Sequence, residues 1–588
     1  MIKKNKILDV FNFNFVVFAL LAIIVFIFWK LDFYFFFWDE WNFLKEFTEN
    51  HYNLFLPHNE HFKPLFKLFY LIELYLFKEN SLLSHYILLI VHALTGFLIF
   101  KITNNFIDSR KLSLLSAVFF IINPFHFGTI LFNFQVCSML NVLVFLISIF
   151  YLQKYLKKQN KFYLYLSYFF CFTQNYFFGT GLILPLLNII FYILFKEKKA
   201  SHYPTLGFTI IFIVNALIYL KFGPINNTSV NFNFFAIKGM IDYFFNGVIV
   251  SLAQSISLVY HPPFFVIISV YTIFLSSIFF LFFLNKKIKD LKVIFFLASF
   301  YIISFILISI TRYQFGIDQV LESRYQYYYF APLSIYIVYF LYNTNKFFKF
   351  KKLINILFAF FLFFYIGQSY LKAHDLKLDR QRLYLENFST LSNFIENKIY
   401  YPNLTNIYPG FSPDEIKKIY LTLTNFNIKD DADYEYLKDI NYIFPIKLGL
   451  EPYQNNYKII SQDANFCQTF FSPYNGLTAI NLYLSTFYQK ITDPYSLYIY
   501  DEKCIKLISK TSIKVEEAQD NRYLKIIFDK IINSENKNFC FTVKPDTSEI
   551  KTPIAIQLSN KNIYNNGALT INSQKIDEDA VFEPMFQF

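Results

Sequence analysis

Ten long apolar runs without a single Asp, Glu, Lys or Arg constrain the fold of this chain more than any other feature. They cover residues 11–29, 82–100, 112–130, 136–153, 162–195, 205–220, 264–284, 293–311, 327–344 and 353–371. About 20 helical residues, each rising about 1.5 Å, cross a hydrocarbon core roughly 30 Å thick. Only 16% of the 588 residues are charged, against roughly 25% in soluble domains. The runs therefore predict a polytopic α-helical membrane protein.

Basic residues are unevenly distributed and indicate the orientation of these spans. Residues 1–371 hold 30 basic and 15 acidic side chains, and residues 372–588 hold 24 and 27. Six basic clusters between the runs fall on one side of the membrane if residues 162–195 cross twice, turning at 179–181. Because short cytoplasmic loops collect Lys and Arg, we expect about eleven spans, a cytoplasmic N-terminus and an exported chain after residue 371. The excess of basic residues is then explained by the orientation of the spans in the membrane, and no nucleic-acid partner is expected.

Two segments need separate interpretation. The first run is longer than the apolar part of a secretory signal and continues into the aromatic residues 33–38, so we expect a retained span and not a cleaved leader. The stretch 240–260 carries Asp242, Asn246 and Gln254. We expect it to form an amphipathic helix on the outer surface.

The sequence pattern of the exported part changes from helical to strand-like along its length. Residues 373–398 have a helical pattern, and Ser412-Pro413-Asp414-Glu415 is a typical helix start. From residue 466 short alternating runs, separated by Asn, Asp, Pro and Gly, predict a β-sandwich. The runs begin at Ile480, Leu497, Tyr523, Cys540 and Ile554, and residues 566–572 resemble a hairpin or bulge connection. The expected domains are thus 1–371 in the membrane, 372–465 as a mixed helical linker and 466–588 as the sandwich.

Three of the five cysteines, Cys467, Cys504 and Cys540, lie in the predicted sandwich. In an oxidising compartment three cysteines allow one disulfide and leave one thiol. The sequence does not choose the pair.

An acidic pair, Asp39-Glu40, lies between Trp38 and Trp41 in the first loop. Carboxylates among interfacial aromatic residues are costly to desolvate and tend toward raised basicity, which suits a general base. The alternative is a pair of solvated loop charges beside an aromatic belt.

The same loop continues with His58-Asn59-Glu60-His61 and then Lys63. Imidazole and carboxylate groups can ligate a divalent cation, so Asp39, His58, Glu60 and His61 are the candidate metal ligands, although their spacing matches no specific metal motif. Hydrogen bonding to a sugar or phosphate is the role that we expect of His58, Glu60 and His61, and metal binding is the alternative. Lys63 could contribute positive charge to a phosphate.

Arg312 and Arg324 lie in the loop between two late runs and oppose the cytoplasmic bias of the basic residues. Arginine binds phosphate through a planar fork, and Tyr325 follows as an aromatic neighbour. These residues are candidates for binding a phosphate group. Snorkelling to lipid headgroups, or pairing with Asp318 or Glu322, is the alternative.

The acidic pair in the first exported loop, the His/Glu/His patch before the next span and the exported C-terminal domain resemble the C-type glycosyltransferase (GT-C) superfamily. The resemblance covers residues 1 to about 371. Members of that superfamily take sugars from polyprenyl-phosphate carriers. The resemblance implies that Asp39, or Glu40 in its place, acts as general base on the acceptor or helps to hold a metal ion.

These features together predict a bacterial inner-membrane glycosyltransferase that moves a hexose or pentose by single displacement, with inversion, from a polyprenyl-phosphate donor. The acceptor would be an exported envelope glycan, lipid or protein. No cofactor is assigned with certainty, and a divalent cation is the one candidate. The rival functions are a transporter or flippase for a lipid-linked glycan, which needs no base, and an envelope assembly protein. Charged residues near the bilayer midplane and paired broken helices would favour transport.

Overall fold

The structure is a computed structural model. It describes residues 2–31, 34, 39–48, 53–55, 57, 62–77, 81–197, 201–222, 234–259, 262–284, 288–312, 323–347, 351–397, 443–445, 450, 456–461, 466–472, 475–518, 520–559, 567–572 and 574–587. The chain forms two compact units, one of residues 1–32 and 49–380 and one of residues 33–48 and 381–588. The second predicted helix start at 412–415 lies outside the described residues.

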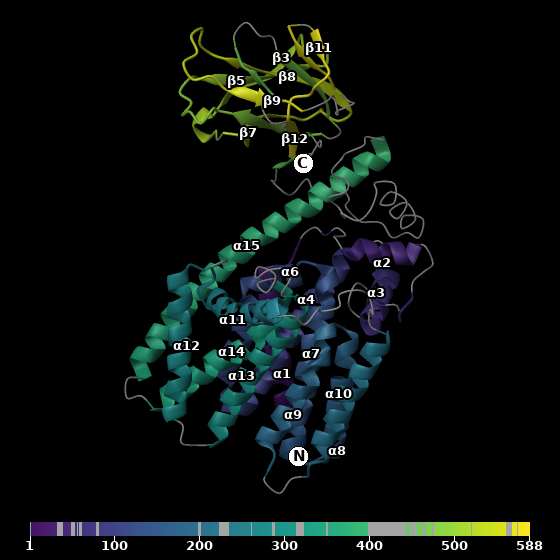
Figure 1. Cartoon of the computed structure of the whole chain (residues 1–588), viewed down its shortest axis with the longest axis vertical. Helices are drawn as coiled ribbons and strands as arrows, with labels where there is room; N and C mark the ends of the chain where they lie inside the picture. Colours follow the sequence, from purple (N-terminus) through teal and green to yellow (C-terminus); the bar gives the residue numbers. More distant parts are fainter. Residues whose placement is uncertain are drawn as a thin grey trace. The chain divides into compact units, whose positions relative to one another are not determined.

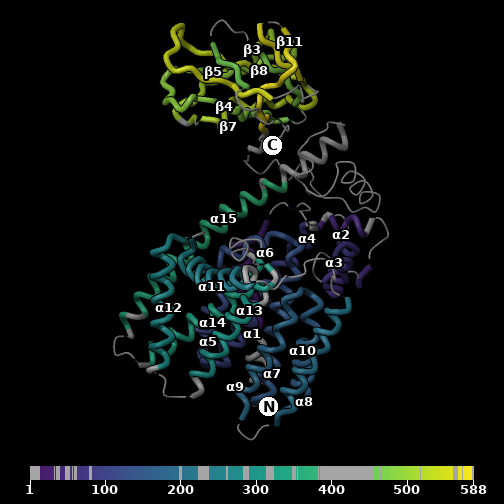
Figure 2. The backbone as a smooth tube through the Cα atoms, viewed as in Figure 1, coloured from purple at the N-terminus to yellow at the C-terminus, as the bar shows by residue number. Residues whose placement is uncertain are grey.

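The first unit is entirely helical in its described part (Figures 1 and 2). Its α-helices are α1 (Ile2–Trp29), α3 (Pro64–Phe77), α4 (Ser81–Ile107), α5 (Arg110–Ile122), α6 (Phe127–Ile130), α7 (Val136–Lys158), α8 (Lys161–Thr173), α9 (Leu184–Phe195), α10 (Tyr203–Phe222), α11 (Phe234–Ser257), α12 (Phe264–Leu284), α13 (Ile288–Arg312), α14 (Ser323–Phe347) and the first part of α15 (Lys351–Asn397). Short 3₁₀ helices interrupt them at η1 (Pro124–His126), η2 (Asn133–Gln135), η3 (Gln174–Tyr176) and η4 (Gly179–Leu182).

Apolar length and burial divide these helices into inner and outer ones. Among the described residues, six helices are long and apolar enough to cross a membrane, or seven if α5 and the segment 124–130, bent by 50°, form one span. The apolar segment that includes α7 is 83% buried, whereas those of α10 and α12 are 11% and 6% buried. A helix that exposes apolar side chains around most of its surface suits contact with lipid. The prediction of eleven spans stays a prediction.

Three segments can be compared directly with the elements that the sequence predicts. Residues 162–195 form two helices, α8 and α9, joined by η3 and η4, in agreement with the predicted break near 179–181. Residues 351–397 form one 47-residue helix, where the sequence suggested a span and a separate exported helix. The predicted surface helix is part of α11, but Ser251–Ser255 near its end are buried. That half packs against other helices, because α11 contacts α12, α13 and α14.

The second unit contains α2 (Asp39–Thr48), the end of α15 and two six-stranded sheets (Figure 1). The strands are β1 (Ile443–Pro445), β2 (Tyr457–Ile459), β3 (Phe466–Ser472), β4 (Leu477–Ser485), β5 (Tyr495–Asp501), β6 (Leu507–Ile513), β7 (Arg522–Ile531), β8 (Lys537–Pro545), β9 (Ala555–Gln557), β10 (Leu569–Ile571), β11 (Gln574–Ile576) and β12 (Phe582–Gln587). One sheet has the order β1-β12-β4-β9-β2 with β7 also on β4, and the other has the order β11-β10-β3-β8-β5-β6.

The two sheets share an aromatic core. Phe582 of the first sheet contacts Phe470 and Phe541 of the second, with ring centroids 5.7 and 5.0 Å apart. On β3 buried and partly exposed residues alternate, because successive side chains of a strand point to opposite faces. The alternating sequence runs thus form the sandwich that they predicted.

Candidate functional site

The predicted acidic pair begins α2. Asp39 is the first residue of this helix, and its side chain lies outside the described residues. The Glu40 side chain is fully buried and accepts hydrogen bonds from the Tyr34 hydroxyl at 2.9 and 3.0 Å. The Tyr34 ring contacts Tyr384, with 4.8 Å between centroids. Glu40 is therefore held by the fold of its own unit, which makes it a poorer candidate than Asp39 for a base that must meet an acceptor.

Tyr34→Phe tests the structural role of Glu40. We expect the variant to lower the free energy of unfolding by roughly 1–3 kcal/mol, because a buried carboxylate loses a hydrogen-bond donor. The measurement is thermal unfolding of the full chain in detergent. Tyr488→Phe removes the same hydroxyl from a side chain that is 91% exposed and is expected to unfold like wild type. Equal unfolding of both variants would show that the Tyr34–Glu40 contact adds no stability.

The next predicted residues follow the first loop. His58, Glu60 and His61 lie outside the described residues, so their role in substrate or metal binding stays a prediction. Lys63 is described and is 1% exposed, with its Nζ atom 4.2 Å from the centroid of the Phe134 ring and 5.9 Å from that of Phe178. An ammonium group near aromatic rings gains a cation–π contribution. Lys63 is thus a buried side chain among aromatic rings and not a solvated loop lysine.

Helix α3 carries further buried charged groups that the sequence analysis did not single out. Lys67 and Glu73 are 0% and 2% exposed, and Glu73 Oε2 lies 3.5 Å from Asn133 Nδ2. Lys67 Nζ donates to the Asn53 carbonyl oxygen at 3.2 Å. The sequence feature that could have identified them is a charged residue inside a short apolar helix. Burying a charge in a membrane protein costs free energy, so such residues commonly have a function.

The two predicted arginines lie at helix ends. Arg312 is the last residue of α13 and is partly exposed. Arg324 is the second residue of α14, and its guanidinium carbon lies 5.1 Å from the ring centroid of Tyr325, which is 3% exposed. Tyr328, about one helical turn after Arg324 on α14, accepts a hydrogen bond from Thr180, two residues after the Phe178 ring that Lys63 contacts. Lys63 and Arg324 therefore belong to one region of the helical unit.

Interrupted helices bring polar side chains to the same region. Asn141 of α7 donates to the Phe178 carbonyl oxygen at 2.9 Å, and its Nδ2 atom lies 3.4 Å from Thr180 Oγ1. Thr180 in turn donates to the Tyr328 hydroxyl of α14 at 2.7 Å. Hydrogen bonds thus join α7, the η4 break and α14 beside the Phe178 ring that Lys63 contacts.

Gly181 allows the two 3₁₀ segments to approach each other. A Cβ atom at this position would lie 2.7 Å from the Cα atom of Asn175 and 2.7 Å from the Gln174 carbonyl oxygen. Neither backbone atom can move without shifting η3. A glycine is required there because any side chain would separate η3 from η4.

The end of α11 contributes further polar groups to this region. Ser255 donates to Gln326 Oε1 of α14 at 3.0 Å, and the Tyr365 hydroxyl of α15 donates to the Ser255 carbonyl oxygen at 3.3 Å. Gln254 is fully buried beside Ser255. We call the whole group the polar cluster. It consists of Lys63, Glu73, Asn133, Asn141, Gln174, Asn175, Thr180, Gln254, Arg324, Gln326 and Tyr328.

Several buried atoms of the polar cluster form no hydrogen bond within the described part of the chain. They are Asn141 Oδ1, Gln174 Oε1, both side-chain polar atoms of Asn175 and Gln254, and Gln326 Nε2. Buried polar groups are almost always hydrogen-bonded to protein or ordered water. In a membrane-embedded helical unit, such a group of amides beside two cations suits water or a polar ligand. The three donors among these atoms, Asn175 Nδ2, Gln254 Nε2 and Gln326 Nε2, together with the positive charges suit an oxyanion such as a phosphate. The four oxygen atoms can accept from water or from hydroxyl groups.

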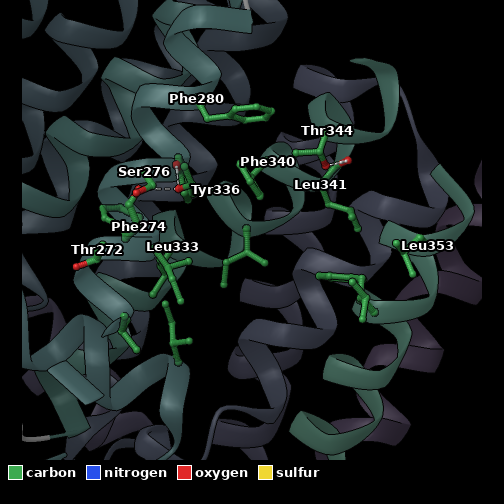
Figure 3. Close-up of a pocket in the computed structure, with 17 residues that line it drawn as sticks. Thr272, Phe274, Ser276, Phe280, Leu333, Tyr336, Phe340, Leu341, Thr344 and Leu353 are labelled. Carbon is green, nitrogen blue, oxygen red and sulfur yellow. Dashed lines mark hydrogen bonds between the residues drawn. The ribbon is translucent and has the colours of Figure 1, made fainter. Parts of the chain in front are cut away.

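A separate apolar cavity of about 940 Å³ lies between α12, α14 and α15 (Figure 3). Leu333, Tyr336 and Phe340 of α14 line it, together with Phe280 of α12 and Leu353 of α15. The main polar contact at its wall joins the hydroxyl groups of Ser277 and Tyr336 at 2.6 Å. Its walls suit a hydrocarbon chain and offer no charged group.

The buried histidines of α4 have packing partners. His92 Nδ1 lies 3.0 Å from the Tyr327 hydroxyl, and Nε2 lies 3.1 Å from the Ile121 carbonyl oxygen. His85 Nε2 lies 3.2 Å from both Leu31 N and the Trp29 carbonyl oxygen. These contacts favour hydrogen bonds between helices over a proton relay for both residues.

No protein-family model matches the chain, and no curated protein matches it. One similar solved structure is the crystal structure of the Archaeoglobus fulgidus oligosaccharyltransferase tethered by a disulfide bond to an acceptor peptide that contains the NVT sequon. The TM-score is 0.39 and the sequence identity 14%, and the match spans 67% of this chain and 58% of that one. The function proposed below rests on the residues of this chain.

Proposed function

We propose that the chain is a membrane glycosyltransferase that transfers a sugar from a polyprenyl-phosphate donor to an envelope glycan, lipid or protein. The observation that carries this proposal is the polar cluster, which contains Lys63, Arg324 and buried amides that each have one or both side-chain polar atoms without a hydrogen bond among the described residues. Phosphate oxygens would accept hydrogen bonds from Arg324 and from the amide donors, and both cations would offset their charge. The leaving phosphate of a lipid-linked sugar is such a group.

The lipid part of the donor has a chemically suitable site. The apolar cavity between α12, α14 and α15 has aliphatic and aromatic walls and a volume of about 940 Å³. The tail of a lipid-linked donor is already surrounded by hydrocarbon in a bilayer, so van der Waals packing against these walls, and not removal from water, would hold it there. Tyr325, next to Arg324 and buried, is proposed to shield the phosphate from water.

For the chemical step, we assign Asp39 as the general base that takes a proton from the acceptor hydroxyl. That oxygen attacks the anomeric carbon, the bond to the phosphate breaks, and Arg324 and Lys63 stabilise the phosphate that leaves. Single displacement inverts the anomeric carbon. Arg312 and the residues His58, Glu60 and His61 are proposed to contact substrate, and a divalent cation held by Asp39, His58, Glu60 and His61 is the candidate cofactor. We place the reaction on the exported side of a bacterial inner membrane.

The second candidate function is transport of a lipid-linked glycan. The paired breaks η1/η2 and η3/η4, and the buried charges Lys67 and Glu73, are features that transporters use near a central binding site. This function would use the same phosphate contacts without a base.

A two-step experiment tests transfer against transport. Mass spectrometry first compares polyprenyl-linked sugars and envelope glycans in cells with and without the protein, and we expect a donor lipid to accumulate and an envelope sugar to disappear. Membranes of the deficient cells, which contain both substrates, are then dissolved in detergent and supplied with purified protein. Transfer to the acceptor in detergent supports a transferase, because transport requires a sealed membrane. Restoration in intact cells without any reaction in detergent would support the transporter instead.

A further inference from the structure

Three cysteines of the sandwich converge on one outer face. Cys467 is on β3, Cys504 is in the turn after β5, and Cys540 is on β8. Their sulfur atoms all lie within 4.8 Å of one another. A sulfur atom forms only one disulfide bond at a time, so these contacts represent mutually exclusive pairs.

Strand register explains why the three residues meet. Strand β8 lies between β3 and β5, and Cys540 is directly opposite Thr469 on β3 and Tyr500 on β5. Cys467 is two residues from Thr469, so it lies diagonally across from Cys540 on the same face. The neighbouring residues Phe466 and Gln468 point into the core, as their burial shows.

Backbone separations select between the pairs. The Cα atoms are 5.5 Å apart for Cys504 and Cys540, 6.3 Å for Cys467 and Cys540, and 7.4 Å for Cys467 and Cys504. Disulfides span Cα separations of roughly 4.4–6.8 Å. Cys540 can thus pair with either neighbour, while Cys467 and Cys504 are too far apart to pair without backbone movement.

Hydrogen bonds to Asp501 fix the conformation of the turn that contains Cys504. Cys504 has a φ of 55°, a left-handed conformation that favours glycine or asparagine. Its backbone N–H donates to the Asp501 carbonyl oxygen at 2.9 Å, and Asp501 Oδ1 accepts from the N–H groups of Ile505 and Lys506 at 3.0 and 3.1 Å. A cysteine in this position places its sulfur over β8 at the cost of an unfavourable backbone conformation.

We propose that Cys467, Cys504 and Cys540 form a thiol–disulfide exchange site in which Cys540 pairs alternately with the other two. The substrate class is a low-molecular-weight disulfide. Such a disulfide takes two electrons from the Cys540 and Cys504 thiols, which become a disulfide while two small thiols are released. This inference does not depend on the proposed sugar transfer.

The internal exchange needs no further oxidant. The Cys467 thiolate attacks the Cys540 sulfur, the Cys467–Cys540 bond forms, and the bond to Cys504 breaks. Cys504 leaves as a thiolate and takes up the proton that Cys467 lost, so the oxidation state is unchanged. Cys467 and Cys504 are partly exposed, whereas Cys540 is 1% exposed. An external disulfide can therefore reach the outer sulfur atom that is free at the time and form a mixed disulfide with it.

Disulfide mapping of the full-length protein tests this site. The protein is equilibrated with oxidised and reduced glutathione, quenched with acid, denatured, alkylated without reduction and digested for mass spectrometry. In wild type we expect two linkages, Cys504–Cys540 and Cys467–Cys540, and glutathione only on Cys467 or Cys504. Cys467→Ser should leave the first linkage, Cys504→Ser the second, and Cys540→Ser none. Cys137 and Cys171, which are buried in the helical unit and unpaired, serve as internal references and should be alkylated throughout.

Three results would overturn the proposal. A Cys467–Cys504 linkage would contradict the assignment of Cys540 as the shared partner. One fixed linkage that does not change with the glutathione ratio would indicate a structural disulfide. Three thiols that resist glutathione oxidation and copurify with one zinc ion per chain would indicate a metal site. The wild-type measurement decides between these outcomes even if a serine variant fails to fold.

Discussion

Asp39→Asn is expected to lower the rate of sugar transfer by about 10²- to 10⁴-fold, the usual contribution of a general base. Asparagine has nearly the same shape as aspartate but cannot accept a proton from the acceptor hydroxyl. The loss should appear in kcat, with little change in the KM for the donor lipid, because the proposed phosphate contacts lie elsewhere. The measurement is transfer in detergent with substrates taken from deficient cells.

Two further variants separate catalysis from folding. Asp39→Glu keeps a carboxylate and should retain more activity than Asp39→Asn. Asp242→Asn makes the same chemical change at an exposed position of α11 and should transfer sugar at the wild-type rate. Full activity of Asp39→Asn would remove Asp39 from the mechanism, and full activity of Glu40→Gln as well would favour the transporter.

Arg324→Gln is expected to raise the KM for the donor by about 10- to 100-fold. Hydrogen bonds to charged groups contribute roughly 1.5–3 kcal/mol, and about 1.4 kcal/mol corresponds to a factor of ten in affinity. Lys63→Gln should have an effect of similar size. Because both cations are proposed to act on one phosphate, the loss in the double variant should differ from the sum of the single losses in free energy.

Matched variants show whether the effect comes from phosphate recognition. Arg324→Lys keeps the charge but loses the planar fork, so its KM should lie between those of wild type and Arg324→Gln. Arg110→Gln removes an exposed arginine at the start of α5, whose guanidinium lies 4.5 Å from the Phe13 ring centroid, and should leave the KM unchanged. Equal KM values for Arg110→Gln and Arg324→Gln would show that Arg324 does not bind the donor.

The site residues that could be predicted from the sequence are those whose immediate neighbours in the chain mark them as unusual. Arg324 and Lys63 stood out because they oppose the charge bias of the loops or follow a polar patch. Glu73 carried a signal that the sequence analysis did not use, a charge inside a short apolar helix, whereas Asn141 and Gln326 carried none. A lone Asn or Gln in a span is explained equally well by helix packing, and only its neighbours in space give it a role.

The structure also changed the interpretation of two predicted elements. The polar residues of 240–260 suggested a surface helix, yet Gln254 and Ser255 are buried, and Ser255 donates a hydrogen bond to Gln326 of α14. Glu40 was an alternative base, and its buried hydrogen bonds with Tyr34 give it a structural partner. In both cases a polar side chain can be satisfied either by water or by a buried hydrogen-bond partner. Tertiary packing decides which of the two it meets.

The sequence by itself determined the classes of secondary structure and where most of them lie. An apolar run of 20 residues must satisfy its own backbone hydrogen bonds in a membrane, which requires a helix, and alternating runs fit a half-buried strand. Only the tertiary structure decided which residues meet, because the polar cluster draws on α3, α7, α11, α14 and the η2, η3 and η4 segments, and the three cysteines draw on two strands and a turn. Such contacts depend on helix packing and strand register, which join residues far apart in the chain, such as Thr180 and Tyr328, which are 148 positions apart.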